Sequence, residues 1–413
     1  MSKRRVGIWF VGALGGVAST AALGISALAR GLVDTTSLVT ATPLFERLPL
    51  ADFDDFIIGG HDIRRSSYVQ SVRELHQRAG VFEERVIQAS TVDLERWTAN
   101  VRPGTVLGAG ATIGKLVELP EVHRVATPRE AVDRIQADLH EFREKQRLDA
   151  LIVANVASTE PPLDLDDRFD DIARFEAALD APGAGIPASA LYGWAALDLG
   201  IPYVNFTPSL GASSPAALEL AHERSTVTCG KDGKTGETLL KTVLAPMFAY
   251  RNFQILSWVG HNIFGNRDGL VLDAPANKAS KVRTKDQVVS SIVGYKPQSH
   301  VSIEYIESLD DWKTAWDHIH FKGFLNTKMI LQFIWQGCDS LLAAPLLLDI
   351  VRLTDLAQRR GEVGVLRHLA CFFKSPMGVE EHDFFKQFAM LGEHLLGHEA
   401  DAGAPANGQP APR

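Results

Sequence analysis

The chain has 413 residues, of which 46% are hydrophobic and 22% are charged, and its formal net charge is −8. This balance is typical of globular domains with a large buried core, and it excludes the basic surface that nucleic-acid binding requires. The length predicts two or three domains. Three cysteines (Cys229, Cys338 and Cys371) lack the CxxC spacing of zinc sites and predict a reduced, cytoplasmic protein.

The first apolar segment covers residues 6–29 and follows three basic residues, so it could also be a signal peptide or a membrane anchor. Five glycines interrupt it, several of them where a strand would turn into a helix. A buried parallel strand followed by a buried helix is also apolar throughout. We therefore predict a strand over Val6–Val11, a helix over Val17–Arg30 and no membrane association.

The loop between this strand and helix (residues 12–17, GALGGV) lies where a dinucleotide-binding fingerprint is expected. Glycines there permit a tight turn and let backbone N–H groups approach a pyrophosphate at the helix N-terminus. The spacing departs from G-x-G-x-x-G, so a plain strand-to-helix turn remains an alternative. The ribose-binding acid is either Asp34, which has roughly the usual spacing, or Asp62 in the segment GGHD.

Short apolar runs then alternate with helical stretches. We predict strands at Leu38–Ala41, Phe56–Ile58 and Ala150–Ala154, and a helix within Val122–Arg147. Such alternation predicts a doubly wound parallel α/β sheet.

The pattern changes after about residue 222. Longer β-type runs at Phe253–Val259 and Val301–Ile306 indicate an inserted α+β region with a more antiparallel sheet. Helical, apolar sequence returns at Met329–Leu356 and near Val365–Phe373.

Three polar clusters in the second half are candidates for chemistry. Residues 232–238 (DGKTGET) superficially suggest a Walker loop, but Thr228 stands where its first glycine should be. Residues 262–269 (NIFGNRDG) could be only a turn. Residues 280–286 (SKVRTKD) place Lys281 and Lys285 four apart on one helix face, which is unfavourable unless an anion lies opposite; a solvated basic face is the alternative.

Two charged residues stand inside apolar runs: Lys374 in FFKSPM and Asp339 in CDSLLAAP. Ionic groups in apolar surroundings are costly unless they are paired, which favours a functional role over a surface role.

Taken in order, these segments resemble the inositol-1-phosphate synthase family in its shorter archaeal and bacterial form. The matching segments reach to about residue 380 and are GALGGVAST, GGHDIR, NVASTEP, NFTPS, DGKTGET, LAPMFAYRN, N-x-x-G-x-x-DG, SKVRTKD, HFKGF, DSLLAAPLLLDI and FFKSPM. The resemblance implies a Rossmann-like NAD-binding domain (residues 1–221 and 329–400) and an inserted α+β domain for catalysis and tetramer formation (residues 222–328). The Ala/Pro/Gly-rich residues 401–413 predict a disordered tail.

The resemblance also assigns site residues. The catalytic residues it implies are Lys281, Lys285, Lys313, Lys374, Asp232 and Asn262. The NAD contacts it implies are Gly12, Leu14, Gly15, Gly16, Val17, Asp62, Ala157, Ser158, Thr159, Asp232, Asn266, Asp268, Asp339 and Ser340. A divalent metal ion held by Asp232 and Asp268 is a further expectation. The sequence departs from the family at His261, where tyrosine is usual, and at Arg267.

The implied reaction is the conversion of D-glucose 6-phosphate to 1L-myo-inositol 1-phosphate by NAD-dependent oxidation at C5, enolisation, aldol cyclisation and re-reduction, in a homotetramer. Each step places negative charge on oxygen, which several lysines around one polyol would stabilise. We assign Lys281 and Lys374 to the C5 oxygen, and Lys285 and Lys313 to the aldehyde oxygen and phosphate. The alternatives are an NAD(P)-dependent dehydrogenase of a sugar phosphate or homoserine-like substrate, and a non-enzymatic NAD-binding homologue.

Overall fold

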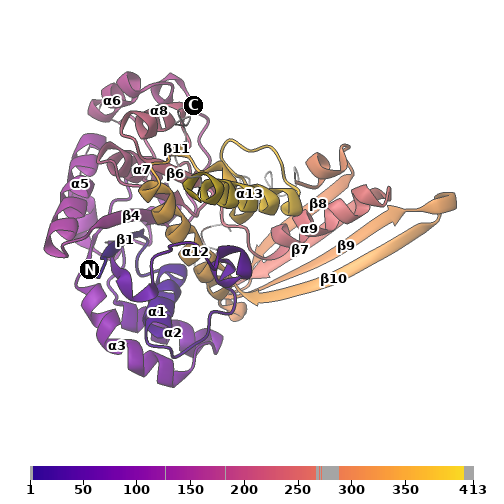
Figure 1. Cartoon of the computed structure of the whole chain (residues 1–413), viewed down its shortest axis with the longest axis horizontal. Helices are drawn as coiled ribbons and strands as arrows, with labels where there is room; N and C mark the ends of the chain where they lie inside the picture. The colour runs from indigo at the N-terminus through magenta and orange to yellow at the C-terminus, as the bar shows by residue number, and fades with distance from the viewer. Residues whose placement is uncertain are drawn as a thin grey trace, which may run out of the picture.

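The computed structural model of the chain describes residues 3–125, 127–181, 183–266, 269, 271 and 288–403. Figure 1 shows a broad α/β body and a second, elongated sheet that projects from it. The first sheet has seven parallel strands and the second has four strands. The cavity described below is lined by residues of both parts.

The seven-stranded sheet has the order β11-β6-β5-β4-β1-β2-β3, and β3 through β6 follow the usual doubly wound order. Its strands are β1 (Val6–Val11), β2 (Phe56–Asp62), β3 (Val101–Pro103), β4 (Ala150–Asn155), β5 (Tyr203–Asn205), β6 (Val227–Gly230) and β11 (Gly364–Val365). All six residues of β1 are buried, as expected for a strand with helices on both faces. The predicted fold class is therefore confirmed.

Helices cover both faces of this sheet. One face is covered by α1 (Gly16–Ala29), α2 (Tyr68–Ala79), α3 (Glu84–Thr98) and α12 (Asp339–Arg359). The other is covered by α5 (Pro128–Lys145), α6 (Ile172–Asp180), α7 (Ala188–Asp198) and α8 (Pro215–Glu223). Side chains of a strand alternate between faces, so Ile8 and Phe10 join the first core while Trp9 and Val11 join the second.

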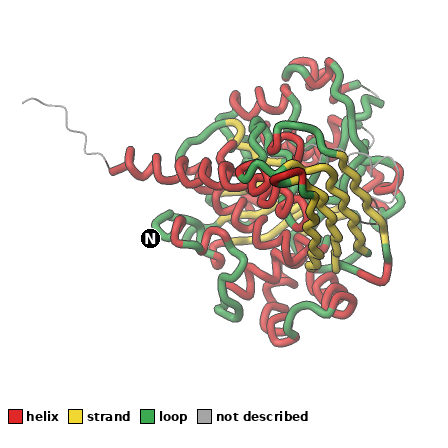
Figure 2. The backbone as a smooth tube through the Cα atoms, turned by 90° about the vertical axis from the view of Figure 1, so that its right-hand side faces the viewer, coloured by secondary structure: helices red, strands yellow, loops and turns green. Residues whose placement is uncertain are grey.

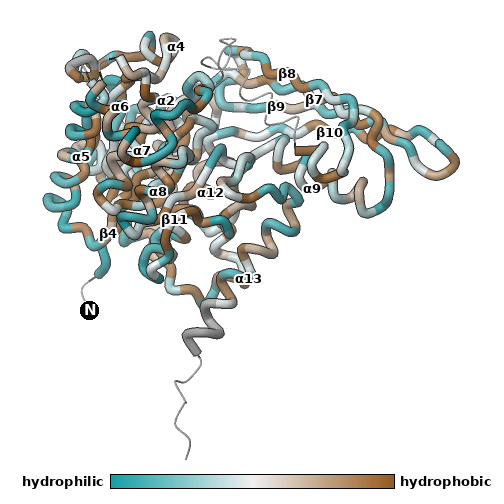
Figure 3. Tube along the Cα trace, turned by 90° about the horizontal axis from the view of Figure 1, so that it is seen from above, coloured by the Kyte–Doolittle hydropathy of each residue, from teal (hydrophilic) through white to brown (hydrophobic). Residues whose placement is uncertain are grey.

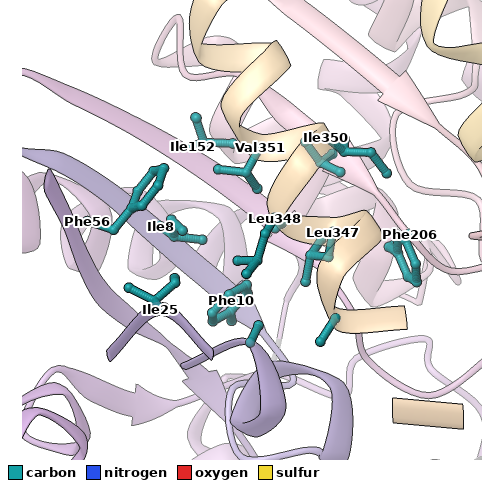
Figure 4. Packing of buried hydrophobic residues seen from close by; sticks show 14 of the residues in the cluster. Ile8, Phe10, Ile25, Phe56, Ile152, Phe206, Leu347, Leu348, Ile350 and Val351 are labelled. Atoms are coloured by element: carbon teal, nitrogen blue, oxygen red, sulfur yellow. The ribbon is translucent and has the colours of Figure 1, made fainter. Parts of the chain in front are cut away.

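Helix α12 comes from the far end of the chain and completes the core around β1. Figure 4 shows Leu347, Leu348 and Val351 of α12 beside Ile8 and Phe10 of β1. These side chains are almost completely buried, so the C-terminal part of the chain and the first strand share one hydrophobic core.

The four-stranded sheet has the order β10-β9-β7-β8, with β7–β9 and β9–β10 antiparallel and β7–β8 parallel. Its strands are β7 (Gln254–Phe264), β8 (Gln298–Tyr305), β9 (Trp312–Lys322) and β10 (Lys328–Cys338). Helix α9 (Gly236–Tyr250) packs on one face, where Phe248 meets Trp258 and Ile319. Figure 3 shows hydrophilic and hydrophobic residues interspersed along these strands.

The remaining elements are short or lie at the end of the chain. They are α4 (Ala111–Gly114), the 3₁₀ helices η1 (Val39–Ala41), η2 (Pro43–Phe45), η3 (Phe53–Asp55), η4 (Pro120–Arg124), η5 (Asp167–Phe169), η6 (Glu307–Leu309), η7 (Phe324–Asn326) and η8 (Arg367–Phe372), and α13 (Phe384–Gly403). Figure 2 shows α13 extending away from the body. Residues 401–403 of the predicted tail end this helix, and residues 404–413 lie outside the described residues.

Three local predictions were wrong. The predicted strand at Leu38–Ala41 contains the 3₁₀ helix η1, and the predicted helix near Val365–Phe373 is β11 followed by η8. The predicted helix over Met329–Leu356 begins only at Asp339, because residues 328–338 form β10. Exposed and half-buried residues alternate along β10, which is the period of a strand that is covered on one face.

The chain passes from the seven-stranded to the four-stranded sheet after β6 and returns after β10, whereas the predicted domain boundaries were at residues 222 and 328. Strand β6, at residues 227–230, pairs with β5 inside the seven-stranded sheet, and β10 belongs to the four-stranded sheet. Among the described residues, no helix combines the length and the apolar composition that a membrane crossing needs.

Candidate active site

A cavity of about 690 Å³ lies at the carboxyl ends of the parallel strands. In open α/β sheets this edge is where ligands bind, beside the strand at which the order reverses, here β1. The predicted site residues that line the cavity are Gly12, Leu14, Gly15, Gly16, Val17, Asp62, Ala157, Ser158, Thr159, Asp232, Asn266, Lys313, Asp339, Ser340 and Lys374. The predicted residues Asp268, Lys281 and Lys285 lie outside the described residues.

Glycines shape one wall of the cavity. Gly12 has a φ of 86°, and a Cβ added there would lie 2.8 Å from the Ala157 Cα. A Cβ on Gly16 would lie 2.5 Å from the Ser340 Oγ. Helix α1 begins at Gly16 without a side-chain cap, so its first N–H groups and its positive dipole end face the cavity. This geometry fits a bound pyrophosphate.

Asp62 fixes the conformation of this glycine loop. One carboxylate oxygen accepts the Leu14 N–H at 2.6 Å, and the other accepts the Ile63 and Arg64 N–H groups, each at 2.8 Å. Burial raises the pKa of Asp62 above its ordinary value. Asp34, the other candidate for the ribose contact, is exposed and accepts the Thr36 N–H of its own turn. Of the two acids, Asp62 is the one that reaches the cavity.

Lys374 and Asp232 form an ion pair on the opposite wall. The Lys374 Nζ lies 2.7 Å from the Asp232 Oδ1, and both side chains are at least nine-tenths buried. Two loops meet here: the Lys374 N–H donates to the Asp232 carbonyl at 2.7 Å, and Gly233 pairs with Phe373. The DGKTGET segment is thus a cavity loop, and its polar residues are held by backbone contacts with FFKSPM.

A second charged group surrounds Lys313. Its Nζ lies 3.7 Å from the Asp339 Oδ1 and 4.8 Å from the centroid of the Phe264 ring. The Asn266 side-chain amide donates to Asp311 at 3.0 Å and to Asp339 at 3.5 Å. This group joins the end of β7, the start of β9 and the first residue of α12 at the cavity.

Asp311 is a cavity residue that the sequence analysis missed. Its carboxylate accepts the Ser340 N–H at 2.7 Å, the Ser340 hydroxyl at 3.1 Å and the Cys338 thiol at 2.9 Å. Burial, together with the nearby Asp339 carboxylate, raises the pKa of Asp311. Its position two residues before Lys313 was the only sequence signal. Arg64, Glu74, Glu160 and Thr207 also line the cavity and were missed.

A small cavity adjoins the large one at the N-terminus of α9, and the predicted residue Asn262 lies there. It is lined by Thr235, Glu237, Thr238, Asn262, Phe264, Ile303, Lys313 and Lys374. The buried Thr238 hydroxyl has no hydrogen-bond partner among the described residues. Two lysine side chains, a helix N-terminus and a hydroxyl together suit an anion such as a phosphate.

A further cluster of possible metal ligands combines Glu362, His368 and His394. The Glu362 Oε2 lies 3.1 Å from the His394 Nε2 and 3.9 Å from the His368 Nδ1. The two imidazole rings are stacked, with centroids 3.7 Å apart and planes 8° from parallel. Since an imidazole nitrogen binds metal in the plane of its ring, two stacked rings cannot both aim at one ion. The cluster therefore joins α13 to η8 and the end of α12 by hydrogen bonding and stacking.

Comparisons with known proteins show which family the chain is similar to. The profile of an NAD-binding family described as myo-inositol-1-phosphate synthase matches residues 6–395. The inositol-3-phosphate synthase 1 of Bacteroides thetaiotaomicron is 32% identical, over 95% of both chains. The Populus euphratica protein of the same name is 29% identical, and the matched part spans 62% of its length.

Crystal structures of related proteins share the fold. A myo-inositol-1-phosphate synthase-related protein from Thermotoga maritima superimposes with a TM-score of 0.77 and 26% identity, over 95% of this chain and 99% of that one. The inositol-3-phosphate synthase of Caenorhabditis elegans gives a TM-score of 0.83 at 24% identity, over 98% and 90% of the two chains, which supports the fold alone.

Proposed function

Because this chain belongs to the myo-inositol-1-phosphate synthase family, we propose that it converts D-glucose 6-phosphate into 1L-myo-inositol 1-phosphate with NAD and without net oxidation or reduction. One observation carries the proposal: the Lys313 and Lys374 ammonium groups line the same cavity as the glycine loop of a dinucleotide site. A reaction that moves hydride and charge within one sugar phosphate needs both features in one enclosed space.

We place NAD along the glycine wall. The loop of residues 12–17 and the start of α1 would hold the pyrophosphate, and Asp62 would keep the loop in position. Ala157, Ser158 and Thr159, after β4, would line the remainder of the cofactor site. Bound there, NAD would supply reversible hydride transfer, so that a ring could close at an unchanged redox level.

Lys374 is our candidate for proton transfer at the C5 oxygen. Its ammonium is held by Asp232 at 2.7 Å inside a largely buried pair, so it is fixed in place and shielded from water. As the neutral amine, Lys374 would accept the C5 hydroxyl proton while hydride leaves C5, and the ammonium so formed, beside Asp232, would return that proton when C5 is reduced again. Lys281 and Lys285 keep their predicted roles at the C5 oxygen and at the aldehyde and phosphate.

The small cavity at the start of α9 has a volume of about 10 Å³, room for about one water molecule, so the substrate phosphate would bind where this cavity meets the large one, beside the shared residues Lys313 and Lys374. Lys313, Lys374 and Thr238 border this cavity, and the first N–H groups of the helix lie beside it. The nearby Glu237 carboxylate is 2.8 Å from the Lys241 ammonium, so its negative charge is compensated within the helix. A phosphate bound there would leave the sugar carbons free to extend toward the glycine wall.

A divalent ion would have one described ligand here. The Asp232 Oδ2 is buried without a hydrogen-bond partner among the described residues, whereas Oδ1 is engaged by Lys374. Carboxylate oxygens suit hard divalent cations, and an ion at Oδ2 could help to neutralise an oxyanion. Asp268 is its predicted second ligand.

We also propose that the chain acts as a cytoplasmic homotetramer. Its three cysteines are free and buried, which suits a reducing compartment.

The contact between subunits is proposed on the four-stranded sheet. Trp316, Ile330 and Ile334 are 41%, 60% and 68% exposed on the face of this sheet away from α9. Exposed apolar side chains on one sheet face, here interspersed with polar ones such as Gln332, suit contact with a second copy. Light scattering should give a tetramer mass, and Ile334→Lys should lower it; an unchanged mass would exclude this face.

The decisive experiment is incubation with glucose 6-phosphate and NAD. Phosphorus NMR should detect inositol phosphate while the absorbance of NADH stays flat. Accumulation of NADH would instead favour a dehydrogenase, and NAD binding without any product would favour a non-enzymatic homologue. The Lys374→Ala variant is the matched control, because it removes the ammonium group and leaves the glycine wall in place.

A further inference from the structure

One end of the large cavity lies beyond Asp62, beside the second strand of the parallel sheet. In doubly wound dinucleotide sites this position faces the adenosine ribose, and its side chains distinguish a free 2′-hydroxyl from a 2′-phosphate. The charged side chains that line this end are Asp62, Arg64, Glu74, Arg78, Lys115 and Glu118. An arginine at this position would normally favour a 2′-phosphate.

Arg64 is held in two directions. One terminal nitrogen donates to the Leu14 carbonyl at 2.7 Å, and the other donates to the Glu74 Oε2 at 2.9 Å. The Arg64 side chain is 13% exposed, while that of Glu74 is 43% exposed. The guanidinium thus serves the glycine loop and Glu74, and both of its terminal nitrogens are engaged.

Lys115 also lines this end, but it is exposed, so water screens its charge. The remaining charges at this end do not favour a dianion either. Arg78 pairs with Asp310 at 2.6 Å, which compensates its charge. The Glu118 carboxylate accepts the Arg65 N–H at 2.9 Å. A 2′-phosphate would enter beside three carboxylates, those of Asp62, Glu74 and Glu118. Like charges at close range are repelled most strongly where water is partly excluded.

We infer that Glu74, by engaging Arg64, makes this cavity select a dinucleotide without a 2′-phosphate. The inference rests on the proposed NAD site and adds a specificity-determining residue to it. Glu74 acts in two ways: it places a negative charge where the phosphate would lie, and it occupies the guanidinium nitrogen that a phosphate would use.

The test measures binding and needs no turnover. NADH and NADPH are titrated into the wild-type chain, Glu74→Gln, and Glu74→Gln combined with Arg64→Met, with nicotinamide fluorescence as the readout. We expect NADPH to bind the wild type at least about 100-fold more weakly than NADH. In Glu74→Gln the ratio of the NADPH to the NADH dissociation constant should fall by about tenfold or more. Adding Arg64→Met should restore the wild-type ratio.

Glu118→Gln is the matched control, because it removes the same charge from the same end of the cavity without releasing a guanidinium. In this control the ratio of the NADPH to the NADH dissociation constant should change by less than about threefold. A shift as large as that of Glu74→Gln would overturn the inference, since net charge alone would then explain it. An unchanged ratio in Glu74→Gln would overturn it while the NAD proposal stands. Failure of the wild type to bind NADH would overturn both.

Discussion

The two walls of the cavity are built by different means. The glycine wall depends on close backbone approach: Gly12 meets Ala157, and the Asp62 carboxylate is bonded to three backbone N–H groups. The lysine wall depends on opposite charges, with Lys374 paired to Asp232 and Lys313 near Asp339. One wall is therefore sensitive to added atoms, and the other is sensitive to lost charges.

This difference separates binding from chemistry. Backbone N–H groups are fixed by the fold and suit a cofactor that keeps its shape during the reaction. Ammonium groups stabilise charge that appears only as the substrate reacts. We expect substitutions on the glycine wall to change cofactor affinity, and substitutions on the lysine wall to change turnover at nearly constant affinity.

The largest effect is expected for Lys374→Ala. Loss of the ammonium should lower the rate of inositol phosphate formation by at least about 10³-fold, because an ammonium near a developing oxyanion is lost. The affinity for NADH, measured by fluorescence, should stay within about threefold, since the glycine wall is untouched. A comparable loss in NADH affinity would contradict the proposal that the lysine wall controls turnover and the glycine wall controls cofactor binding.

The stability of this variant must be measured separately. Removing one member of a buried ion pair typically costs about 3–5 kcal/mol, because the remaining charge lacks its partner. If Lys374→Ala does not fold, Lys374→Met combined with Asp232→Asn removes both charges and tests the same loss of turnover. Lys386→Ala is the surface control: its pair with Glu381 is 2.8 Å long, but the lysine is 58% exposed, so activity should be unchanged.

The second effect concerns Gly12→Ala. A methyl group there would collide with the Ala157 backbone, and the positive φ of 86° disfavours any side chain. NADH affinity should fall by about 100-fold or more, because the loop must shift away from the pyrophosphate position. Thermal unfolding should show a destabilisation of about 1–3 kcal/mol.

Gly31→Ala is the control that separates backbone strain at positive φ from steric collision with a neighbouring residue. Gly31 has a φ of 64° just beyond the other end of α1, and a Cβ there would have nothing within 4 Å. This variant should lose about 1 kcal/mol of stability and keep its NADH affinity. Equal loss of affinity in both variants would mean that the stability of α1, rather than the contact with Ala157, controls binding.

The two walls also differ in how much of each could be predicted from the sequence. The glycine wall is formed by residues close in sequence to strand ends, so the loop at residues 12–17 was predicted from its place in the chain, whereas the sequence left Asp34 and Asp62 as alternatives for the ribose contact. Glu74 lies on the second turn from the end of α2, and at the cavity its carboxylate accepts from Arg64, which also donates to the Leu14 carbonyl. No local pattern indicates that contact.

The lysine wall depends on distant segments. Asp311 contacts Ser340 only because β9 and β10 form a long hairpin that returns the chain to the start of α12. The sequence predicted a helix where β10 lies, since an apolar run of this length is compatible with both periods. The error hid the hairpin and, with it, the reason for an acid at position 311.

The last prediction, which contrasts most sharply with the lysine wall, concerns Glu160. This carboxylate lines the cavity after β4 and is bonded to Ser189 at the start of α7, through the backbone N–H at 2.8 Å and through the hydroxyl. No lysine, arginine or histidine among the described residues pairs with it at salt-bridge distance, and burial raises its pKa to about 7. Asp232, by contrast, has the Lys374 ammonium at 2.7 Å. The unfolded chain releases the Glu160 proton near pH 4.5, whereas the folded chain keeps it to about pH 7.

Folding therefore takes up a proton between these values, so the contribution of Glu160 to stability is largest below pH 4.5 and declines as the pH rises to about 7. Glu160→Gln cannot ionise, and its stability relative to the wild type should improve by about 1–3 kcal/mol between pH 5 and pH 8, measured by chemical unfolding. Glu219→Gln is the control, because this exposed glutamate also accepts a backbone N–H, from Ile172 at 3.1 Å, but is not buried. A stability difference that stays constant across this range for Glu160→Gln would mean that Ser189 alone holds the carboxylate ionised. The glycine wall would then resemble the lysine wall in keeping a full negative charge beside the ligand.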